Sequence, residues 1–169
     1  STFRSGHVMK GFVAGLSGFL CSLLMFGCNS GRPIEDFGIE KLTKGVSTEA
    51  EVRQAMGEPT MIWHEADGVR TFEYPRGPEG HRTWMIELDA TGVLRDYRQT
   101  LTEENFARVQ AGMTREEVRR LLGKARSSQA FPLKNEEVWD WHYLTGSATE
   151  RFFNVHFDRE SGRVTRTSH

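Results

Sequence analysis

A short phrase that starts a helix occurs twice in this chain of 169 residues, and it constrains the fold more than any other feature. Thr48 and Thr114 lie 66 residues apart, and a glutamate follows each of them after three positions. This spacing is typical of a capping box, in which the hydroxyl accepts from a first-turn amide and the carboxylate accepts from the amide of the cap residue. The sequence therefore predicts two short helices of the same design.

The residues around each capping box repeat as well. Each predicted helix ends at a glycine, Gly57 or Gly123, where a left-handed C-terminal cap is expected. A shorter helical segment is expected before each box, and Thr102 is a candidate N-cap for the second of these segments. Each half of the chain therefore begins with a short helix, a glycine turn and a capped helix.

Alternation of apolar and polar residues, which indicates strands with one buried face, follows each pair of helices. The expected strands are 71–74, 84–88 and 94–99 in the first half, and 139–143, 153–157 and 163–167 in the second. Helices beside an antiparallel meander are typical of a two-layer sandwich. We therefore predict an α+β fold with two tandem two-layer units over residues 34–100 and 101–169. Each unit would be helix-helix followed by a three-stranded antiparallel sheet.

Units of this size are expected to be only marginally stable in isolation. A domain of about 60 residues buries only about 60% of the surface that its unfolded chain exposes. We therefore expect the two units to lean on one another, or to extend each other's sheets.

The first 27 residues are expected to be a secretory signal peptide, for which Met9 is a candidate translation start. Residues 11–28 contain no charge, Arg4 and Lys10 precede them, and the first acidic residue is Glu35. A basic region followed by an apolar run is typical of export, and the run is short for a membrane-spanning helix. A retained membrane anchor is the alternative.

The end of the apolar run, Leu-Met-Phe-Gly-Cys at 24–28, resembles a bacterial lipobox. The resemblance implies that Cys28 becomes the first residue of the mature chain and carries a diacylglycerol and an N-acyl chain, with residues 28–33 as the lipidated cysteine and its tether. Each buried methylene adds about 0.8 kcal/mol of membrane affinity. The chain has only one other cysteine, Cys21, which would leave with the signal. Alternatively, Cys28 is merely an apolar residue of the signal.

The remaining composition excludes some functions. Without residues 1–27 the chain has 20 basic and 23 acidic residues, and this balance argues against nucleic-acid binding. Neither His64 nor His81 comes with an identifiable nucleophile, and Ser127-Ser128 does not lie in a Gly-x-Ser-x-Gly motif. We therefore expect no catalytic site, no small-molecule substrate and no cofactor beyond the lipid.

Three side chains on expected strands, Asp140, His142 and His156, are of types that bind zinc. No closely spaced pair of histidines or cysteines supports a metal, so we expect them to face solvent opposite an aromatic core and predict no metal site. Trp84, Trp139 and Trp141 are expected in that core.

A partner-binding surface is the remaining possibility. Aromatic residues often anchor interfaces, and Trp63 lies among polar neighbours. The glycine-rich, charged segment 74–82 is either a freely flexing loop or a recognition loop. The candidate contact residues are Trp63, Tyr74, Arg76, His81 and Arg82.

The motifs of the second half resemble the BamE (SmpA/OmlA) lipoprotein family. The resemblance rests on Gly112–Gly123, on Trp139-x-Trp141-x-Tyr143, and on Val155-x-Phe157-Asp158 with Gly162-x-Val164. The first half resembles the family more loosely, through 48–59, 72–74 and 86–92. This implies a tandem pair of BamE-like domains.

The family resemblance also implies a location and a role. It implies a non-enzymatic lipoprotein on the periplasmic face of the outer membrane. The residue after Cys28 is Asn29 and not the aspartate that commonly retains lipoproteins at the inner membrane, which agrees with this location. Its partners would be periplasmic or outer-membrane proteins, such as the barrel-assembly machinery, and it would act as an adaptor in outer-membrane protein assembly or envelope maintenance. A similar duplicated unit occurs in secreted β-lactamase inhibitors, so a periplasmic or secreted enzyme inhibitor is the alternative.

Overall fold

The computed structural model describes residues 38–77 and 79–169, which belong to one compact unit. The expected signal peptide, Cys28 and the tether lie outside the described residues. In the described part of the chain, no helix is long and apolar enough to cross a membrane. Residues 38–100 are called the first half below, and residues 101–169 the second half.

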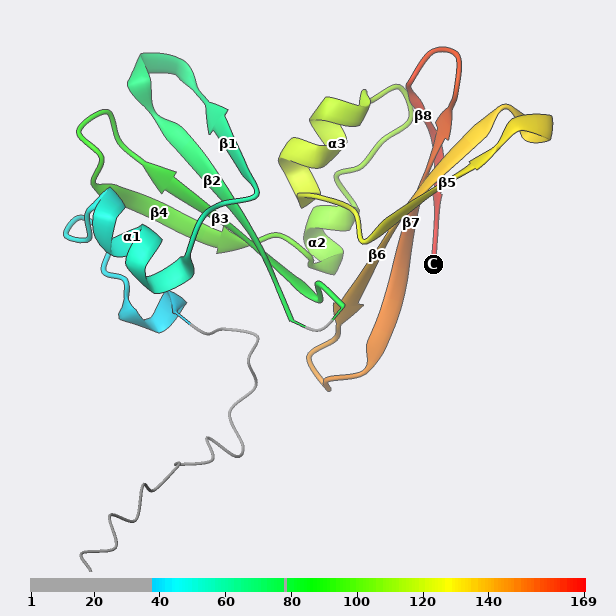
Figure 1. Ribbon diagram of the computed structural model, residues 1–169. Helices are drawn as coiled ribbons and strands as arrows, with labels where there is room; N and C mark the ends of the chain where they lie inside the picture. Colours follow the sequence, from blue (N-terminus) through cyan, green and yellow to red (C-terminus); the bar gives the residue numbers. More distant parts are fainter. Residues whose placement is uncertain (1–37, 78) are drawn as a thin grey trace, which may run out of the picture. The chain divides into compact units, whose positions relative to one another are not determined.

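Both halves have the same order of elements, helix, capped helix and four strands (Figure 1). The first half contains η2 (Ile39–Lys41), α1 (Glu49–Met56), β1 (Met61–His64), η3 (Ala66–Gly68), β2 (Arg70–Arg76), β3 (Arg82–Leu88) and β4 (Leu94–Gln99). The second half contains α2 (Glu103–Phe106), α3 (Arg115–Leu122), β5 (Ser127–Phe131), η4 (Pro132–Lys134), β6 (Glu136–Leu144), β7 (Glu150–Asp158) and β8 (Val164–Ser168). Each sheet is an antiparallel meander in which strands pair in chain order.

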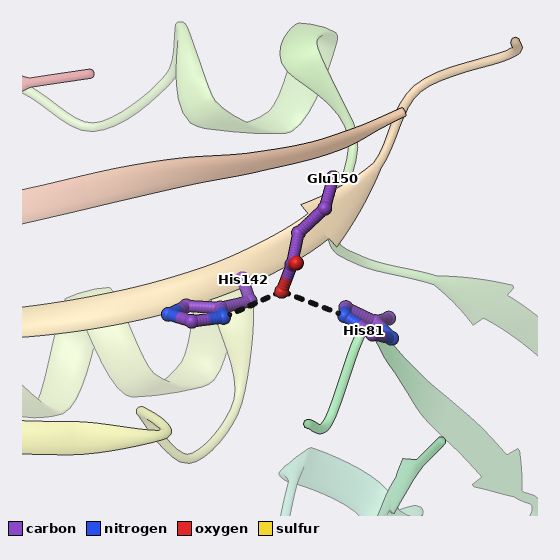
Figure 2. A group of neighbouring side chains, drawn as sticks. All are labelled: His81, His142 and Glu150. Carbon is purple, nitrogen blue, oxygen red and sulfur yellow. Dashed lines mark hydrogen bonds and ion pairs between the residues drawn. The ribbon is translucent and has the colours of Figure 1, made fainter. Parts of the chain in front are cut away.

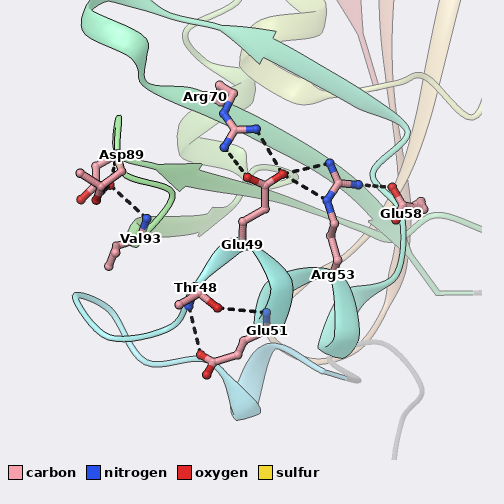
Figure 3. Close-up of polar contacts among 9 residues, drawn as sticks. Thr48, Glu49, Glu51, Arg53, Glu58, Arg70, Asp89 and Val93 are labelled. Carbon is pink, nitrogen blue, oxygen red and sulfur yellow. Dashed lines mark hydrogen bonds and ion pairs between the residues drawn. The ribbon is translucent and has the colours of Figure 1, made fainter.

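Both capping boxes are present, as the sequence predicts. At the start of α1, Thr48 N–H donates to Glu51 Oε2 over 3.0 Å, and Glu51 N–H donates to Thr48 Oγ1 over 3.4 Å (Figure 3). At the start of α3, the corresponding bonds between Thr114 and Glu117 measure 2.9 and 3.1 Å. Thr102 caps α2 by accepting from the Asn105 amide. These bonds satisfy amides that the first turn of a helix leaves without a partner.

The glycines that end α1 and α3 adopt a different backbone conformation from the expected one. Gly57 has φ 80° and ψ −161°, and Gly123 has φ 89° and ψ −173°. The positive φ agrees with the prediction, but ψ lies near 180° instead of in the left-handed helical region. This is a region that is open almost only to glycine. The chain therefore leaves each helix in an extended direction, which sends it directly into the first strand of the sheet.

The prediction of three strands in each sheet is wrong, because β1 and β5 add a fourth strand to each. β1 pairs with β2, and β5 pairs with β6. All residues of β5 are exposed, and those of β1 are half-buried or exposed. A strand without a buried face shows no alternation of apolar and polar residues, so the pattern that predicts the other strands cannot detect these two.

Each half has a hydrophobic cluster between its helices and the inner face of its sheet. The cluster of the first half contains Ile39, Leu42, Val52, Met56, Phe72, Tyr74, Ile86, Leu88 and Leu94. The cluster of the second half contains Leu101, Phe106, Val109, Val118, Leu122, Trp141, Tyr143, Phe153, Val155, Phe157 and Val164. Trp84 and Trp139 are half-buried against these clusters, and Trp141 lies within one.

An ion pair ties the capped helix to its sheet in each half, with the charges exchanged. Glu49 on α1 accepts from Arg70 on β2, and it also accepts from Arg53 over 3.1 Å (Figure 3). In the second half, the helix residue is Arg115, which lies 2.6 Å from Glu137 on β6. The two halves therefore use the same position on the helix for the same contact with opposite charges.

Candidate functional site

The outer face of the first sheet, which points away from the first hydrophobic cluster, is covered by the second half. Glu73 on β2 and Thr83 and Met85 on β3 lie on this face and are almost completely buried. Gly123, at the end of α3, approaches so closely that a Cβ atom there would lie 2.5 Å from Thr83 Cγ2. Thr100 Oγ1 donates to the Leu122 carbonyl over 2.7 Å. The end of α3 therefore packs against both sheets.

A buried carboxylate lies at the centre of this contact. Glu73 has no exposed surface, and its Oε1 accepts from the Lys124 amide that follows α3. Arg119 Nε lies 3.5 Å from Glu73 Oε2, which is an ion-pair distance but outside hydrogen-bond geometry. A buried charge is tolerated only where it is paired and hydrogen-bonded. Glu73 therefore specifies where the second half docks.

Trp63, a candidate residue for contact with a partner, instead contacts the second half of the same chain. The Arg120 guanidinium on α3 lies 4.5 Å from the centre of the Trp63 ring, within the range of a cation–π interaction. The same guanidinium lies 2.9 Å from Glu65. Trp63 therefore anchors the second half to the first.

Three further candidate contact residues belong to strands, so the expected loop 74–82 shortens to the residues between β2 and β3. Tyr74 is completely buried, which raises the pKa of its hydroxyl to about 12, and it donates to the Gly57 carbonyl over 3.0 Å. Arg76 is half-buried and donates to the Met56 carbonyl. Arg82 begins β3 and is half-buried. The interpretation of Tyr74 as a surface contact is therefore wrong, because its ring is part of the core.

His81 is the candidate contact residue that lies beside other side chains able to bind a proton or a metal ion. Figure 2 shows the imidazoles of His81 and His142 pointing toward the carboxylate of Glu150. His81 Nε2 lies 3.1 Å from Glu150 Oε1, and His142 Nδ1 lies 2.8 Å from the same oxygen. The hydrogen bonds from His81 and then His142 lower the pKa of Glu150. The cluster joins the β2–β3 loop to β6 and β7.

The grouping of Asp140, His142 and His156 considered from the sequence is only half formed. His142 Nε2 lies 3.2 Å from Asp140 Oδ2. His156 instead bonds to Glu136 and, over 2.8 Å, to Ser168 Oγ. Both histidines lie on the outer face of the second sheet as expected, but they are largely buried instead of facing solvent.

The rest of that outer face is open. A hollow of about 370 Å³ extends over β5 to β8, and its lining includes Gln129, Val138, Asn154 and Arg166. The tip that joins β5 to β6 is apolar and exposed, with Leu133 fully exposed and Phe131 partly exposed. An apolar side chain that protrudes into solvent beside an edge strand is suited to contact with a partner.

Phe131, Leu133 and Glu150 are not among the site residues predicted from the sequence. Leu133 lies in a Pro-Leu-Lys-Asn turn, and a large apolar residue in a turn between two strands is a signal that could have found it. Glu150 gives no such signal, because acidic residues are common on exposed strand positions.

Comparisons with known proteins identify the second half. Residues 99–167 match the family model described as the outer membrane protein assembly factor BamE domain. None of the curated proteins matches the sequence.

Several solved structures are similar at low identity. One is a proposed β-lactamase inhibitor protein from Streptococcus mutans, with 12% identity, 72% of this chain and 81% of that chain covered, and a TM-score of 0.28. Another is a DUF4309 family protein (YjgB) from Bacillus subtilis, with 20% identity, 75% and 79% covered, and a TM-score of 0.30. A third is an extracellular protein containing an SCP domain from Bacillus anthracis, with 10% identity, 81% and 46% covered, and a TM-score of 0.31. TM-scores this low carry no argument about fold or function, so the assignment rests on the family model. The family model therefore supports a BamE-like second half over residues 99–167.

Proposed function

We propose that this protein is a non-enzymatic lipoprotein on the periplasmic face of the outer membrane, where it acts as an adaptor in outer-membrane protein assembly or envelope maintenance. The observation that carries the proposal is the BamE-family domain of residues 99–167. A family of assembly factors works by binding other proteins. The surface that this domain leaves open is therefore the first place to look for a partner.

The β5–β6 hairpin offers that surface. β5 is an edge strand of its sheet, and all its residues are exposed. It contains no charged side chain and no proline, the features with which natural proteins usually protect an edge. An extended segment of a partner protein can add to such an edge through backbone hydrogen bonds. Phe131 and Leu133 would then hold apolar side chains of the partner at the tip.

Site-specific crosslinking in cells tests this surface. A photoreactive residue replaces Leu133 in one variant and Gln129 on β5 in another. The matched control is Val46, an exposed apolar residue of the first half. We expect crosslinks from both second-half positions to a protein of the outer-membrane assembly machinery, and none to that protein from Val46.

Two other outcomes would count against the proposal. Crosslinks to a single hydrolase would favour the alternative function, an inhibitor that blocks an enzyme. Equal crosslinking from Val46 and Leu133 would show that the hairpin is not the contact surface.

The lipid anchor is tested separately. Metabolic labelling with palmitate is expected to mark the wild-type protein and to fail for Cys28→Ala. The Cys28→Ala protein is also expected to leave the membrane fraction. A variant that still fractionates with membranes would contradict the lipid anchor but would leave the crosslinking result unaffected.

A further inference from the structure

We propose that His81, His142 and Glu150 form a binding site for a divalent transition-metal ion, zinc, that joins the two halves of the molecule. His81 comes from the β2–β3 loop of the first half, His142 from β6 and Glu150 from β7 (Figure 2). Two imidazoles and one carboxylate are a donor set that zinc accepts readily, with a fourth position left open.

The distances between the donor atoms suit a small ion. The three candidate ligand atoms all lie within 4.8 Å of one another. Glu150 Oε1 lies 3.1 Å from His81 Nε2 and 2.8 Å from His142 Nδ1. Ligands of a tetrahedral zinc ion, bound at about 2.0–2.2 Å, are separated by about 3.3–3.6 Å. To admit the ion, Glu150 Oε1 would move away from both imidazole nitrogens, and these two nitrogens, which lie at most 4.8 Å apart, would adjust their separation.

The surroundings of His142 give a second, independent argument. This imidazole lies between two carboxylates, because Nδ1 faces Glu150 and Nε2 lies 3.2 Å from Asp140 Oδ2. An ion held by His142 Nδ1 and Glu150 would leave Nε2 directed at Asp140, which is at an ion-pair distance but outside hydrogen-bond geometry. Histidine ligands of metals are commonly oriented by such a carboxylate.

The site is also held in place and partly shielded. The side chains of His81 and His142 are 11% and 10% exposed. The ring of Phe152, the cross-strand neighbour of His142, packs edge-on against the imidazole with 4.3 Å between the ring centres. Asp140 is fixed in turn by Ser127 Oγ, over 2.6 Å. Rigid ligands and a supported carboxylate favour binding because little ordering remains to be done.

Binding at this site would have a structural consequence. The ion would tie the β2–β3 loop to β6 and β7, so it would stabilise the packing of the first half against the second. Because an ion that binds only the folded state raises stability by mass action, unfolding should become dependent on zinc concentration. The fourth position would take a water molecule or a ligand from a partner protein.

Zinc titration of protein purified without a histidine tag and stripped with a chelator tests the proposal. Isothermal titration calorimetry is expected to show one zinc ion per chain, and elemental analysis after dialysis should give the same ratio. His142→Ala and Glu150→Gln are expected to abolish stoichiometric binding. Asp140→Asn, which changes only the supporting carboxylate, is expected to weaken binding by about 10–100-fold.

The matched control is His64→Ala, because His64 is an exposed histidine on β1 outside the cluster. This variant is expected to bind zinc like the wild type. Glu150 is 44% exposed, so Glu150→Gln should fold normally, and its circular dichroism spectrum checks this. Absence of stoichiometric zinc from the wild-type protein would overturn the proposal, and so would unchanged affinity in Glu150→Gln and His142→Ala.

Discussion

The two sheets of this molecule have the same strand order, but they differ in how far their outer faces are exposed to solvent. The outer face of the first sheet is covered by the end of α3, and Glu73, Thr83 and Met85 are almost completely buried there. The outer face of the second sheet carries an open hollow and an exposed edge strand. A shared local design therefore does not decide which surfaces stay free. The docking of one half on the other decides it.

The asymmetry can be followed at equivalent positions. Met85 lies on β3 between the inward residues Trp84 and Ile86, and Asn154 lies on β7 between Phe153 and Val155. Met85 is completely buried, whereas Asn154 lines the hollow of the second sheet. At β2 and β3 the first sheet is therefore buried on both faces, whereas the outer face of the second sheet is open around the hollow.

Substitution of these two residues gives the largest expected difference. Met85→Ala removes a fully buried side chain, so we expect a loss of about 2–5 kcal/mol in the free energy of unfolding. Asn154→Ala changes a half-buried polar residue that lines the open hollow, so we expect a change within about 0.5 kcal/mol. Urea denaturation followed by circular dichroism measures both. Equal losses in the free energy of unfolding would contradict the difference between the two sheets, because they would mean that both outer faces are equally buried.

The glycines at the helix ends give a smaller but more specific difference. Both have positive φ, so Gly57→Ala and Gly123→Ala share a backbone cost of about 1–3 kcal/mol. A Cβ at Gly123 would also meet Thr83, whereas a Cβ at Gly57 has nothing within 4 Å. We therefore expect Gly123→Ala to lose about 1–3 kcal/mol more than Gly57→Ala in the same denaturation experiment.

A double-variant cycle identifies the source of this excess. Thr83→Ala removes the methyl group that the new Cβ would meet, so combining it with Gly123→Ala should recover part of the extra loss. Strict additivity of the two substitutions would show that the close approach of α3 to β3 is not what distinguishes the two glycines.

The ion pairs between helix and sheet, Glu49–Arg70 and Arg115–Glu137, should contribute similarly to stability in acid. This is the smallest of the expected effects. The hydrogen bond from Arg70 lowers the pKa of Glu49. Burial raises the pKa of Glu137, but hydrogen bonds from Trp139 and Arg115 outweigh it and leave this pKa lowered too. A carboxyl group with a lowered folded-state pKa stabilises the fold above its unfolded pKa of about 4.3, and this contribution is lost as pH falls through the folded-state value.

Glu49→Gln and Glu137→Gln should therefore each make unfolding less sensitive to pH between about pH 6 and about pH 3. Each effect should be below about 1 kcal/mol, because both pairs are partly exposed to solvent. Thermal denaturation across this pH range measures it. A clear pH effect for only one of the two variants would show that the exchanged charges are not equivalent.

Local patterns accounted for the helices and most of the strands. The capping boxes at Thr48 and Thr114 depend on hydrogen bonds between residues three positions apart, so a short segment contains all the information needed. The other six strands are visible from period-two alternation of apolar and polar residues. Strands β1 and β5 were missed because their residues have no consistently buried face.

The candidate site was less accessible to sequence reasoning. The alternation in Thr71-Phe72-Glu73-Tyr74 predicts that Glu73 points away from the first hydrophobic cluster, and it does. The second half of the molecule nevertheless buries it. His81 and Glu150 are 69 residues apart and meet only when the halves dock. The pattern ends the predicted strand 71–74 at Tyr74 and starts the predicted loop 74–82 there, because Pro75 and the following glycines favour a turn, whereas β2 extends through Arg76.

Local sequence patterns are enough to predict the two capped helices, the inward faces of the sheets and the BamE-like character of the second half. These features follow from contacts within a few residues or from a periodic pattern. Only the tertiary structure decided which outer face is buried, which edge is free and which histidines meet. The physical reason is that docking one half on the other depends on the complementary shapes and charges of surfaces whose residues are far apart in the chain, and no local pattern records that complementarity.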